Sequence, residues 1–477
     1  MIEISQNITE YLTSLYGSET AGIYFDFIKK DHTSYIRMNP LSGDTEKTLA
    51  RLSEYGINLE KVENIPNAYK VLSGIDMAGK TIEYNLGRYY IQSLSSMIPP
   101  LILSPSENDR VLDLCSAPGS KATQIASLMN NRGTLVTNEP QLDRIKMLIH
   151  NIDKLNLINT GVIQFKGEWL SRAYNNYFDK ILVDAPCSAL GVLQKKEEVS
   201  RWWSRERMEK IAFLQLMILT SAVKMAKVGG EIVYSTCTLT PEENELIINH
   251  VLNKYPLEVL DIDLPLKAHQ GFTSYRGTTL NPNLTKARRI LPWEVESEGF
   301  FIIKLRKKGE LEPSKPLGEH GSQEYKILEY RNKEVFKYLT EISDTFGIDE
   351  EKWRNFKFII KGSDIFFISR SWHDNNPSLF TRIGTQFGTI DKRGHAHLHS
   401  FAAQYFGRDI KHNIYQIQSE KELKDYLSGG IIRCNLNTNE QQIIKYRDLV
   451  LGTAAPVNNG LKSQYPKSKR IHEVSYF

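Results

Sequence analysis

Short apolar runs alternate with amphipathic stretches through the middle of the chain, between about residues 81 and 305. Apolar runs bounded by polar or small residues are typical of buried strands, and apolar residues spaced three and four apart are typical of helices. The strand-like runs lie at 111–114, 133–137, 161–165, 180–184 and 231–235, and the helical stretches lie at 141–155 and 205–226. Strands that alternate with helices at this spacing predict an α/β fold with a doubly wound, mainly parallel sheet.

The pattern changes on either side of this core. The first 80 residues combine a helical pattern at 46–55 with a short extended piece at 35–39, which indicates a small α+β domain. Towards the C-terminus, shorter strands such as 356–360 and 364–368 lie between glycines and prolines. We therefore expect five parts: an N-terminal domain at 1–80, the α/β core at 81–308, a polar linker at 309–323, a small α+β domain at 324–390 and a β-rich domain at 391–477.

Length and composition exclude several classes of protein. A chain of 477 residues is too long for one core, and its 41% hydrophobic and 24% charged residues are ordinary for a globular protein. Four scattered cysteines are too few for a disulfide framework or a zinc knuckle, which favours a reducing compartment. The N-terminus lacks the pattern of a signal peptide, and no run approaches the ~18 apolar residues of a membrane span. We expect a cytoplasmic monomer with no membrane partner.

The net charge of +4 is too small to identify a nucleic-acid partner by itself. The positive excess gathers near the C-terminus, where Lys462, Lys467, Lys469 and Arg470 surround Tyr465. Basic residues with an aromatic residue among them suit a phosphate backbone, so this tail is one candidate for an RNA contact. A solvated terminus explains the same residues equally well, and composition leaves both interpretations open.

A tight turn of small residues follows the apolar run at 111–114. Gly119 and the small residues before it let the backbone approach a ligand closely, and Lys121 falls in the first turn of the helix expected next. Glu139 follows the next strand-like run, where an acidic residue can accept hydrogen bonds from ribose hydroxyls. Together these features predict a nucleoside cofactor with free ribose hydroxyls, although an unliganded tight turn explains the glycine alone about as well.

Two cysteines close apolar runs in different parts of the core. Cys187 follows Asp184 in Asp-Ala-Pro-Cys, and Cys237 ends Ser-Thr-Cys, so both thiols are expected at the carboxyl edge of the sheet. Carbon 5 of cytosine is a poor nucleophile, and a thiolate that adds at carbon 6 activates it for methylation. This chemistry needs a nucleophilic thiol, an acid near ring nitrogen 3 and a base, and these three side chains are candidates. Residue chemistry leaves the order of the thiols open. Cys434 is interpreted as a small buried apolar residue, which also suits Cys115.

Two further groups of residues invite functional interpretations. His395, His397 and His399 share one face if their segment is a strand, but such a cluster is more often solvated or hydrogen-bonded, and we expect no metal. Trp202 and Trp203 follow the Asp-Ala-Pro-Cys loop and are candidates for stacking on a base. Anchoring of the next helix explains Trp203 equally well.

Three stretches resemble the hallmark motifs of a known family. Asp113-Leu-Cys-Ser-Ala-Pro-Gly-Ser-Lys121, Asp184-Ala-Pro-Cys-Ser188 and Ser235-Thr-Cys-Thr-Leu-Thr-Pro-Glu-Glu-Asn-Glu245 are similar to motifs of the RNA cytosine-5 methyltransferases of the NOL/NOP/Sun superfamily. The segments at 87–97 and 289–302 resemble the family's entry motif and closing strands. The segment at 451–466 resembles the PUA-like tail of its RsmF (YebU) branch, which modifies small-subunit ribosomal RNA in bacteria. The resemblance implies a Rossmann-like S-adenosylmethionine-dependent methyltransferase core between an N-terminal RNA-binding domain and a PUA-like RNA-binding domain.

The resemblance also assigns roles to residues. It implies that Cys237 is the nucleophile and that Cys187 helps to release the product, with Asp184 beside them. S-adenosylmethionine would be held by Cys115, Ser116, Ala117, Pro118, Gly119, Ser120, Lys121, Glu139 and Asp184. One position departs from the family, because Lys166 stands where an aspartate usually contacts the adenine, with Glu168 as the acidic residue nearby.

The function expected from the resemblance is S-adenosylmethionine-dependent methylation of carbon 5 of cytosine in RNA, through a covalent intermediate between Cys237 and the cytosine. The expected partner is 16S ribosomal RNA, within a small ribosomal subunit or an assembly intermediate. A tRNA cytosine-5 methyltransferase would share every catalytic residue, and the Lys166 departure keeps a non-catalytic RNA-binding or ribosome-assembly factor as a second alternative. Cys237, Cys187 and Asp184 favour catalysis, because a binding module has no need of two thiols.

Overall fold

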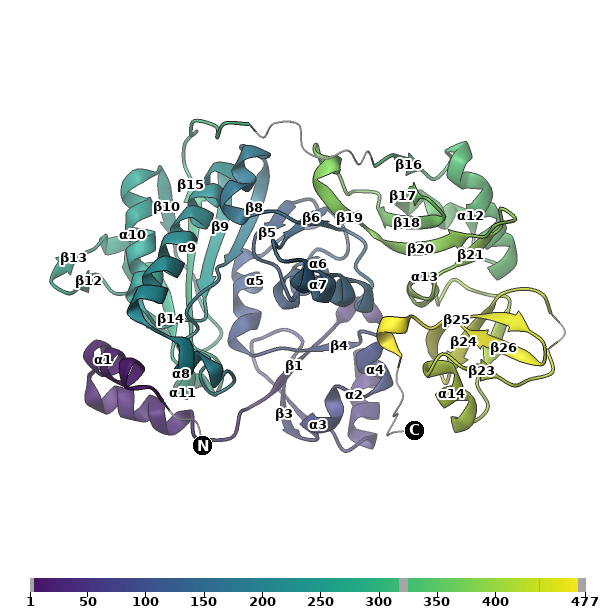
Figure 1. The fold of residues 1–477 in the computed structure, drawn as a ribbon, viewed down its shortest axis with the longest axis horizontal. Helices are drawn as coiled ribbons and strands as arrows, with labels where there is room; N and C mark the ends of the chain where they lie inside the picture. The colour runs from purple at the N-terminus through teal and green to yellow at the C-terminus, as the bar shows by residue number, and fades with distance from the viewer. Residues whose placement is uncertain (1–3, 317–324, 437, 471–477) are drawn as a thin grey trace.

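The computed structural model of the protein describes residues 4–316, 325–436 and 438–470 (Figure 1). Residues 317–323 of the expected linker lie outside the described residues, as do residues 1–3 at the N-terminus, where no signal peptide is expected. Within the described ranges a ten-stranded sheet forms the centre, a four-stranded sheet precedes it and two five-stranded sheets follow it.

The central sheet contains the five strands that the apolar runs predict. They are β5 (Arg110–Asp113), β6 (Thr134–Asn138), β7 (Thr160–Ile163), β8 (Phe178–Asp184) and β9 (Ala226–Thr236). They lie side by side in the order β9-β8-β5-β6-β7, and each neighbouring pair is parallel. The expected α/β fold is confirmed, and the carboxyl ends of these strands share the edge at which such sheets bind ligands.

Antiparallel strands extend this sheet on both sides. Next to β9 the additional strands are β15 (Phe300–Lys307), β14 (Arg288–Ile290), β11 (His269–Gln270) and β10 (Leu257–Leu260). At the other edge β19 (Phe380–Ile383) pairs with β7, and Thr381 Oγ1 donates a hydrogen bond to the carbonyl oxygen of Val162 at 3.0 Å. The region expected as a small domain at 324–390 thus contributes one strand to the central sheet.

Helices bury the central sheet on both faces. The face that carries Val111 packs against α5 (Ile98–Leu103), α6 (Ser120–Leu128) and α7 (Leu142–Lys154). The face that carries Leu112 packs against α9 (Arg205–Met225) and α10 (Glu245–Lys254). The helical stretches expected at 141–155 and 205–226 are confirmed. None of the described helices is both long and apolar enough to cross a bilayer.

The four-stranded sheet stands before the core. Its strands are β1 (Tyr35–Met38), β2 (Asn58–Lys61), β3 (Ala68–Ser73) and β4 (Tyr89–Ile91), in the order β2-β3-β1-β4, with α2 (Thr45–Glu54) after β1. Because β4 belongs to it, this sheet continues beyond the expected boundary at residue 80. Arg37 joins it to α6, since the guanidinium donates hydrogen bonds to Ser120 O at 2.9 Å and to Thr123 Oγ1 at 2.8 Å.

The two C-terminal sheets follow each other along the chain. The first contains β16 (Ile327–Glu329), β17 (Phe356–Lys361), β18 (Asp364–Ser369), β20 (Thr385–Ile390) and β21 (Ala396–Leu398), with α12 (Lys333–Phe346) against it. The second contains β22 (Ile414–Gln416), β24 (Gln442–Tyr446), β25 (Leu449–Val457), β26 (Gly460–Ser463) and β23 (Ile431–Ile432), with α13 (Ser400–Tyr405) and α14 (Glu420–Leu427). The boundary expected after residue 390 falls between β20 and β21, which pair in one sheet.

The basic tail differs from the expected exposed patch. Tyr465 is only 2% exposed and packs on Tyr426, with 5.6 Å between the ring centres. Lys469 is 3% exposed, and its ammonium lies 4.6 Å from the centre of the Phe401 ring, where burial lowers its pKa to about 7. The ammonium of Lys462 donates a hydrogen bond to a backbone carbonyl oxygen. The interpretation of the whole tail as a phosphate-binding patch is therefore wrong for Tyr465 and Lys469, because folding places them in the interior.

Candidate active site

The two cysteines that the sequence singles out lie side by side. Cys237 directly follows β9, and Cys187 lies three residues beyond the end of β8, the neighbouring parallel strand. Ala185 N donates to Ser235 O at 2.9 Å, so the strand pairing continues into the Asp-Ala-Pro-Cys loop. The Sγ atoms of Cys187 and Cys237 are 3.2 Å apart, and both thiols are free and partly buried. The sheet thus brings together two side chains that are distant in sequence.

Asp184 is held next to these thiols by a cation and a hydroxyl group. Lys121 of α6 lies 2.7 Å from Asp184 Oδ2, and Ser235 donates a hydrogen bond to Oδ1 at 2.8 Å. Burial disfavours the charged ammonium of Lys121, but the carboxylate of Asp184 outweighs that effect and raises the pKa of the lysine. The Asp184 side chain is 26% exposed, so it remains accessible to a ligand.

A buried carboxylate ties the two cysteine loops together. Glu243 follows Cys237 in the next loop and is fully buried. It accepts hydrogen bonds from Ser188 N at 2.7 Å, from the Ser188 hydroxyl and from Thr240 Oγ1 at 2.7 Å. Gln215 of α9 donates to the same carboxylate at 3.1 Å and to Pro186 O at 2.8 Å. Glu243 was not identified from the sequence as a site residue, since its partners are distant along the chain.

The hydrogen bond between the thiols makes them unequal. It raises the pKa of the Cys187 thiol well above its ordinary value, and burial adds to the rise. Burial also raises the pKa of Cys115 well above its ordinary value. A protonated thiol is a poor nucleophile, so this arrangement favours Cys237 as the reactive sulfur.

The turn of small residues between β5 and α6 packs closely against α7. Gly119 has φ of +110°, and a Cβ at this position would lie 3.0 Å from Leu148 Cδ1. Ser116 N donates to Asn138 O at 3.0 Å, and Arg144 donates to Ala117 O at 2.6 Å. These bonds fix the turn beside the carboxyl end of β6, where the sequence analysis expects a nucleoside.

Two buried carboxylates flank this turn. Glu139 is 1% exposed and receives Gln141 N at 3.0 Å and Arg144 at 3.0 Å, which leaves further lone pairs on its oxygens. Asp113, at the end of β5, is completely buried, and neither carboxylate oxygen has a hydrogen-bond partner among the described residues. Burial, reinforced by the charge of Asp184, raises the pKa of Asp113 to about 7. Asp113 lies in the quoted motif, but the sequence analysis gave it no role.

Other candidates from the sequence have ordinary structural surroundings. Trp203 is 3% exposed and packs 5.1 Å from the ring centre of Tyr11, so it anchors the core and is not free to stack on a base. Trp202 is half-buried, with the Arg207 guanidinium 4.4 Å from its ring centre. Cys434 is partly buried against the core of the last sheet.

The histidines do not share one face of a strand as expected. His395 precedes β21 and bonds Glu341 at 2.7 Å, and His397 lies within β21, 3.4 Å from Asp391. His399 caps α13 by accepting a hydrogen bond from a backbone N–H. No group of three metal-ligating side chains occurs in the part of the chain that the structure describes.

The departure at Lys166 is visible just beyond β7. Lys166 is exposed, and its ammonium lies 4.7 Å from the ring centre of Trp169. Glu168 is half-buried in the 3₁₀ turn Gly167–Arg172. Glu168 is thus the acidic residue that lies two positions after Lys166 along the chain.

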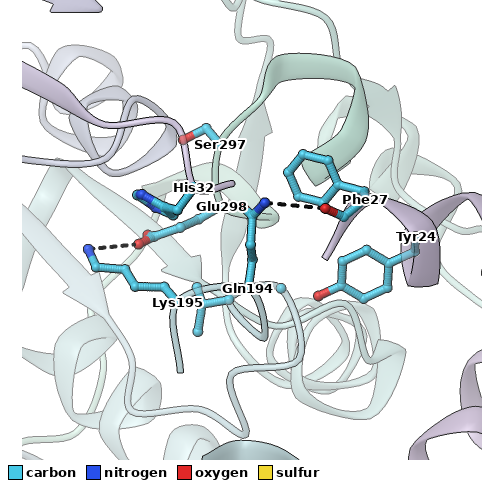
Figure 2. A pocket seen from close by; sticks show the side chains of 9 residues that line it. Tyr24, Phe27, His32, Gln194, Lys195, Ser297 and Glu298 are labelled. Atoms are coloured by element: carbon cyan, nitrogen blue, oxygen red, sulfur yellow. Dashed lines mark hydrogen bonds and ion pairs between the residues drawn. The ribbon is translucent and has the colours of Figure 1, made fainter. Parts of the chain in front are cut away.

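A small cavity backs the Cys237 loop. Figure 2 shows its wall, in which the ion pair of Lys195 and Glu298 and the hydrogen bond from Gln194 to Phe27 O lie around a space of about 10 Å³. That volume suits about one water molecule and no larger ligand. Gly191, in the same wall, donates a hydrogen bond to Cys237 O at 3.0 Å, so this region supports the loop.

Comparison with known proteins identifies the type of enzyme. A family model for the 16S rRNA methyltransferase RsmB/F matches residues 100–306. A tRNA (cytosine(49)-C(5))-methyltransferase of Pyrococcus abyssi is 34% identical over 64% of this chain and 97% of its own length. The ribosomal RNA small subunit methyltransferase F of Cronobacter sakazakii is 30% identical over 91% of this chain and 89% of its own length. The crystal structure of a methyltransferase homolog from Pyrococcus horikoshii has a TM-score of 0.56 and 27% identity, and it matches 64% of this chain and 100% of that one.

The fold and these matches define a Rossmann-like methyltransferase. More specifically, the chain belongs to the family of RNA cytosine-C5 methyltransferases that includes the RsmB/F enzymes. The resemblance inferred from its sequence motifs is confirmed.

Proposed function

We propose that this protein methylates carbon 5 of cytosine in small-subunit ribosomal RNA, with S-adenosylmethionine as the methyl donor and Cys237 as the nucleophile. The observation that carries the proposal is the pair of sulfur atoms that lie 3.2 Å apart, on the loops that follow two neighbouring parallel strands. A non-catalytic RNA-binding factor would have no use for this arrangement. We place the enzyme in the cytoplasm, acting as a monomer.

The residues around the small-residue turn fit a nucleoside cofactor. The turn at residues 115–120 consists of small residues and packs closely on α7, since a Cβ at Gly119 would lie 3.0 Å from Leu148 Cδ1. The free lone pairs of Glu139 suit ribose hydroxyls. The unpartnered oxygens of Asp113 suit a donor or cation brought by a ligand. S-adenosylmethionine, bound here, would supply the electrophilic methyl group that the activated cytosine accepts.

The side chains of the site then perform the covalent chemistry. The Cys237 thiolate forms a bond to carbon 6, and the electron pair of the double bond between carbons 5 and 6 shifts towards nitrogen 3. Nitrogen 3 takes up a proton from water, and the Asp184 carboxylate accepts a hydrogen bond from the resulting N–H group. Carbon 5 becomes the nucleophile of an enamine. After methylation a base removes the carbon 5 proton, the double bond between carbons 5 and 6 forms again, and Cys237 leaves as a thiolate. Cys187 assists this last step, because its sulfur adjoins Cys237.

The choice of ribosomal RNA depends on the C-terminal sheets. The match to the tRNA methyltransferase covers 64% of the chain, whereas the match to the small-subunit ribosomal RNA methyltransferase covers 91%. A chain that matches the second relative over almost its whole length shares more of its domains with that relative than with the tRNA methyltransferase. For this reason we favour ribosomal RNA over tRNA.

The test compares two substrates with one enzyme. Purified protein is incubated with S-adenosylmethionine and with unmodified transcripts of small-subunit ribosomal RNA or tRNA, and 5-methylcytidine is measured by mass spectrometry. We expect methylation of the ribosomal transcript and its loss in Cys237→Ser, because a serine hydroxyl is a far weaker nucleophile than a thiolate. Methylation of tRNA alone would contradict the substrate, and no 5-methylcytidine on any RNA would contradict the function.

A further inference from the structure

A large groove opens on the side of the molecule away from the cysteines. Its volume is about 1110 Å³. The loop before α2, the segment before β4, the C-terminal ends of α6 and α7 and loops of both C-terminal sheets all line it. In Figure 1 these elements meet to the right of α6 and α7. The ends of α6 and α7 lead into the amino ends of β6 and β7, whereas the cysteines follow the carboxyl ends of the strands.

The groove carries an excess of unpaired positive charge. Lys47, Arg88, Arg370, Arg408 and Lys445 line it, and no carboxylate oxygen of the described residues lies within 4.0 Å of their charged groups. Most of these side chains are exposed, while Arg88 and Lys445 are half-buried. These five cations without an ion-pair partner outnumber the three carboxylates of the wall, so the concave surface carries an excess of positive charge.

The carboxylates of the groove are fewer than its cations and have partners of their own. Asp409 pairs with Lys352 at 2.7 Å, and Asp448 pairs with Arg51. Asp44 caps the N-terminus of α2 by accepting hydrogen bonds from two backbone N–H groups. Each acidic side chain in the wall is therefore engaged with a partner of its own.

Arg88 shows how firmly one of the cations is placed. A Cβ at Gly43 would overlap Arg88 Nη1, so the glycine makes room for the guanidinium. Burial lowers the pKa of Arg88; the carboxylates of Asp448 and Glu83 act against this effect, and the cations Arg51 and Arg408 reinforce it. A half-buried guanidinium that lies near like charges is stabilised when an anion binds to it.

We propose that this groove binds the sugar–phosphate backbone of the RNA substrate at a distance from the target cytosine. The proposal rests on the proposed function, because it takes the ligand to be RNA. Several cations in one groove suit the repeated phosphates of an RNA strand. Contacts to phosphates supply affinity and register but do not distinguish one base from another. β6 has five residues, so about 17 Å separate the groove from the strand ends that carry the catalytic loops. The enzyme would therefore hold a long or folded RNA at two places.

The experiment measures binding of the full chain to a small-subunit ribosomal RNA transcript over a salt titration. The groove variant Lys47→Gln/Arg370→Gln/Arg408→Gln is compared with the wild type. A matched control, Lys80→Gln/Arg393→Gln/Lys421→Gln, removes the same number of positive charges from exposed residues that lie outside the groove. Circular dichroism and thermal unfolding check that all three proteins are folded.

We expect the groove variant to bind more weakly and with a lower salt dependence. Three lost phosphate contacts lower the slope of log K against log salt by about 2–3, so between 50 and 200 mM salt the wild type loses about 20–40-fold more affinity than the variant does. The control should follow the wild type. If the groove variant has the same slope of log K against log salt as the wild type or the control, the proposal is overturned. The groove would then be assigned to an acidic protein surface instead of RNA. The binding measurement tests only the groove. A wild-type protein that binds RNA through the groove but transfers no methyl group would contradict the proposed function and leave the groove proposal standing.

Discussion

Replacing Glu243 by glutamine tests whether the two cysteine loops are positioned by one buried carboxylate. Glu243 accepts four hydrogen bonds, two of them from Ser188 and the others from Thr240 and Gln215. Glutamine has nearly the same size, but one of its two oxygens becomes an NH₂ group that cannot accept. At least one donor next to Cys187 therefore loses its partner.

The size of the effect follows from these bonds. A hydrogen bond to a charged group contributes about 1.5–3 kcal/mol, and a buried donor left without a partner costs about 1–3 kcal/mol. Hydroxyl groups can rotate to accept from the new NH₂, so we expect a net loss near the middle of these ranges, about 2 kcal/mol. That loss corresponds to a fall in Tm of about 4–8 °C in a domain of this size. The thiol spacing of 3.2 Å should also relax, and a misplacement of about 1 Å costs about 100-fold in rate.

Two assays and one control decide this prediction. Thermal unfolding measures the stability, and single-turnover methylation of RNA measures the chemical step. Glu242→Gln is the control, because Glu242 contacts Tyr11 and Tyr275 and makes no hydrogen bond to the Cys187 loop. Wild-type stability together with a wild-type rate in Glu243→Gln would refute the positioning role.

Three further predictions concern single side chains. Cys187→Ala should accumulate a covalent protein–RNA adduct, seen as a slowly migrating band on a denaturing gel. The band should be absent when Cys237 is also replaced, and an adduct that forms without Cys237 would show that the roles of the two thiols are reversed. Gly119→Ala should raise the Kd for S-adenosylmethionine about ten-fold, as measured by calorimetry. An alanine in the left-handed backbone conformation costs about 1–2 kcal/mol, and its Cβ meets Leu148. An unchanged Kd would show that the turn is not part of the cofactor site. Lys469→Met should raise Tm at pH 7. The pKa of Lys469 is about 7 in the folded protein and 10.5 in the unfolded chain, so protonation of the lysine disfavours folding as the pH falls from 10.5 to 7. The gain should shrink towards pH 10.5, and a gain that is independent of pH would contradict the cause.

The local pattern of the sequence predicts the core well. The five parallel strands and the two long helices follow from apolar periodicity, which depends on residues close together in the chain. The pairing of β19 with β7 does not follow from this periodicity. Nothing in the sequence of residues 380–383 indicates whether the strand joins the edge of the central sheet or the sheet of the C-terminal strands around it. The expected domain boundaries near residues 80 and 390 pass through or beside sheets for the same reason.

The site is predicted in part. Cys187, Cys237 and Asp184 could be found because each closes an apolar run, and parallel strands bring such ends together. Glu243 could not, since its role depends on hydrogen bonds across the fold to Ser188 and Gln215. The burial of Lys469 could not be predicted either, because a lysine near the C-terminus is normally solvated.

The most direct test of the central claim is bisulfite sequencing of total RNA from three strains: one with the native protein, one without it and one that carries Cys237→Ser in its place. If the chain is an RNA cytosine-5 methyltransferase that uses Cys237, 5-methylcytosine at one or more positions of small-subunit ribosomal RNA will be present in the first strain and absent from the other two. Methylation that is identical in all three strains would contradict the function, and methylation that the Cys237→Ser protein restores would contradict the nucleophile.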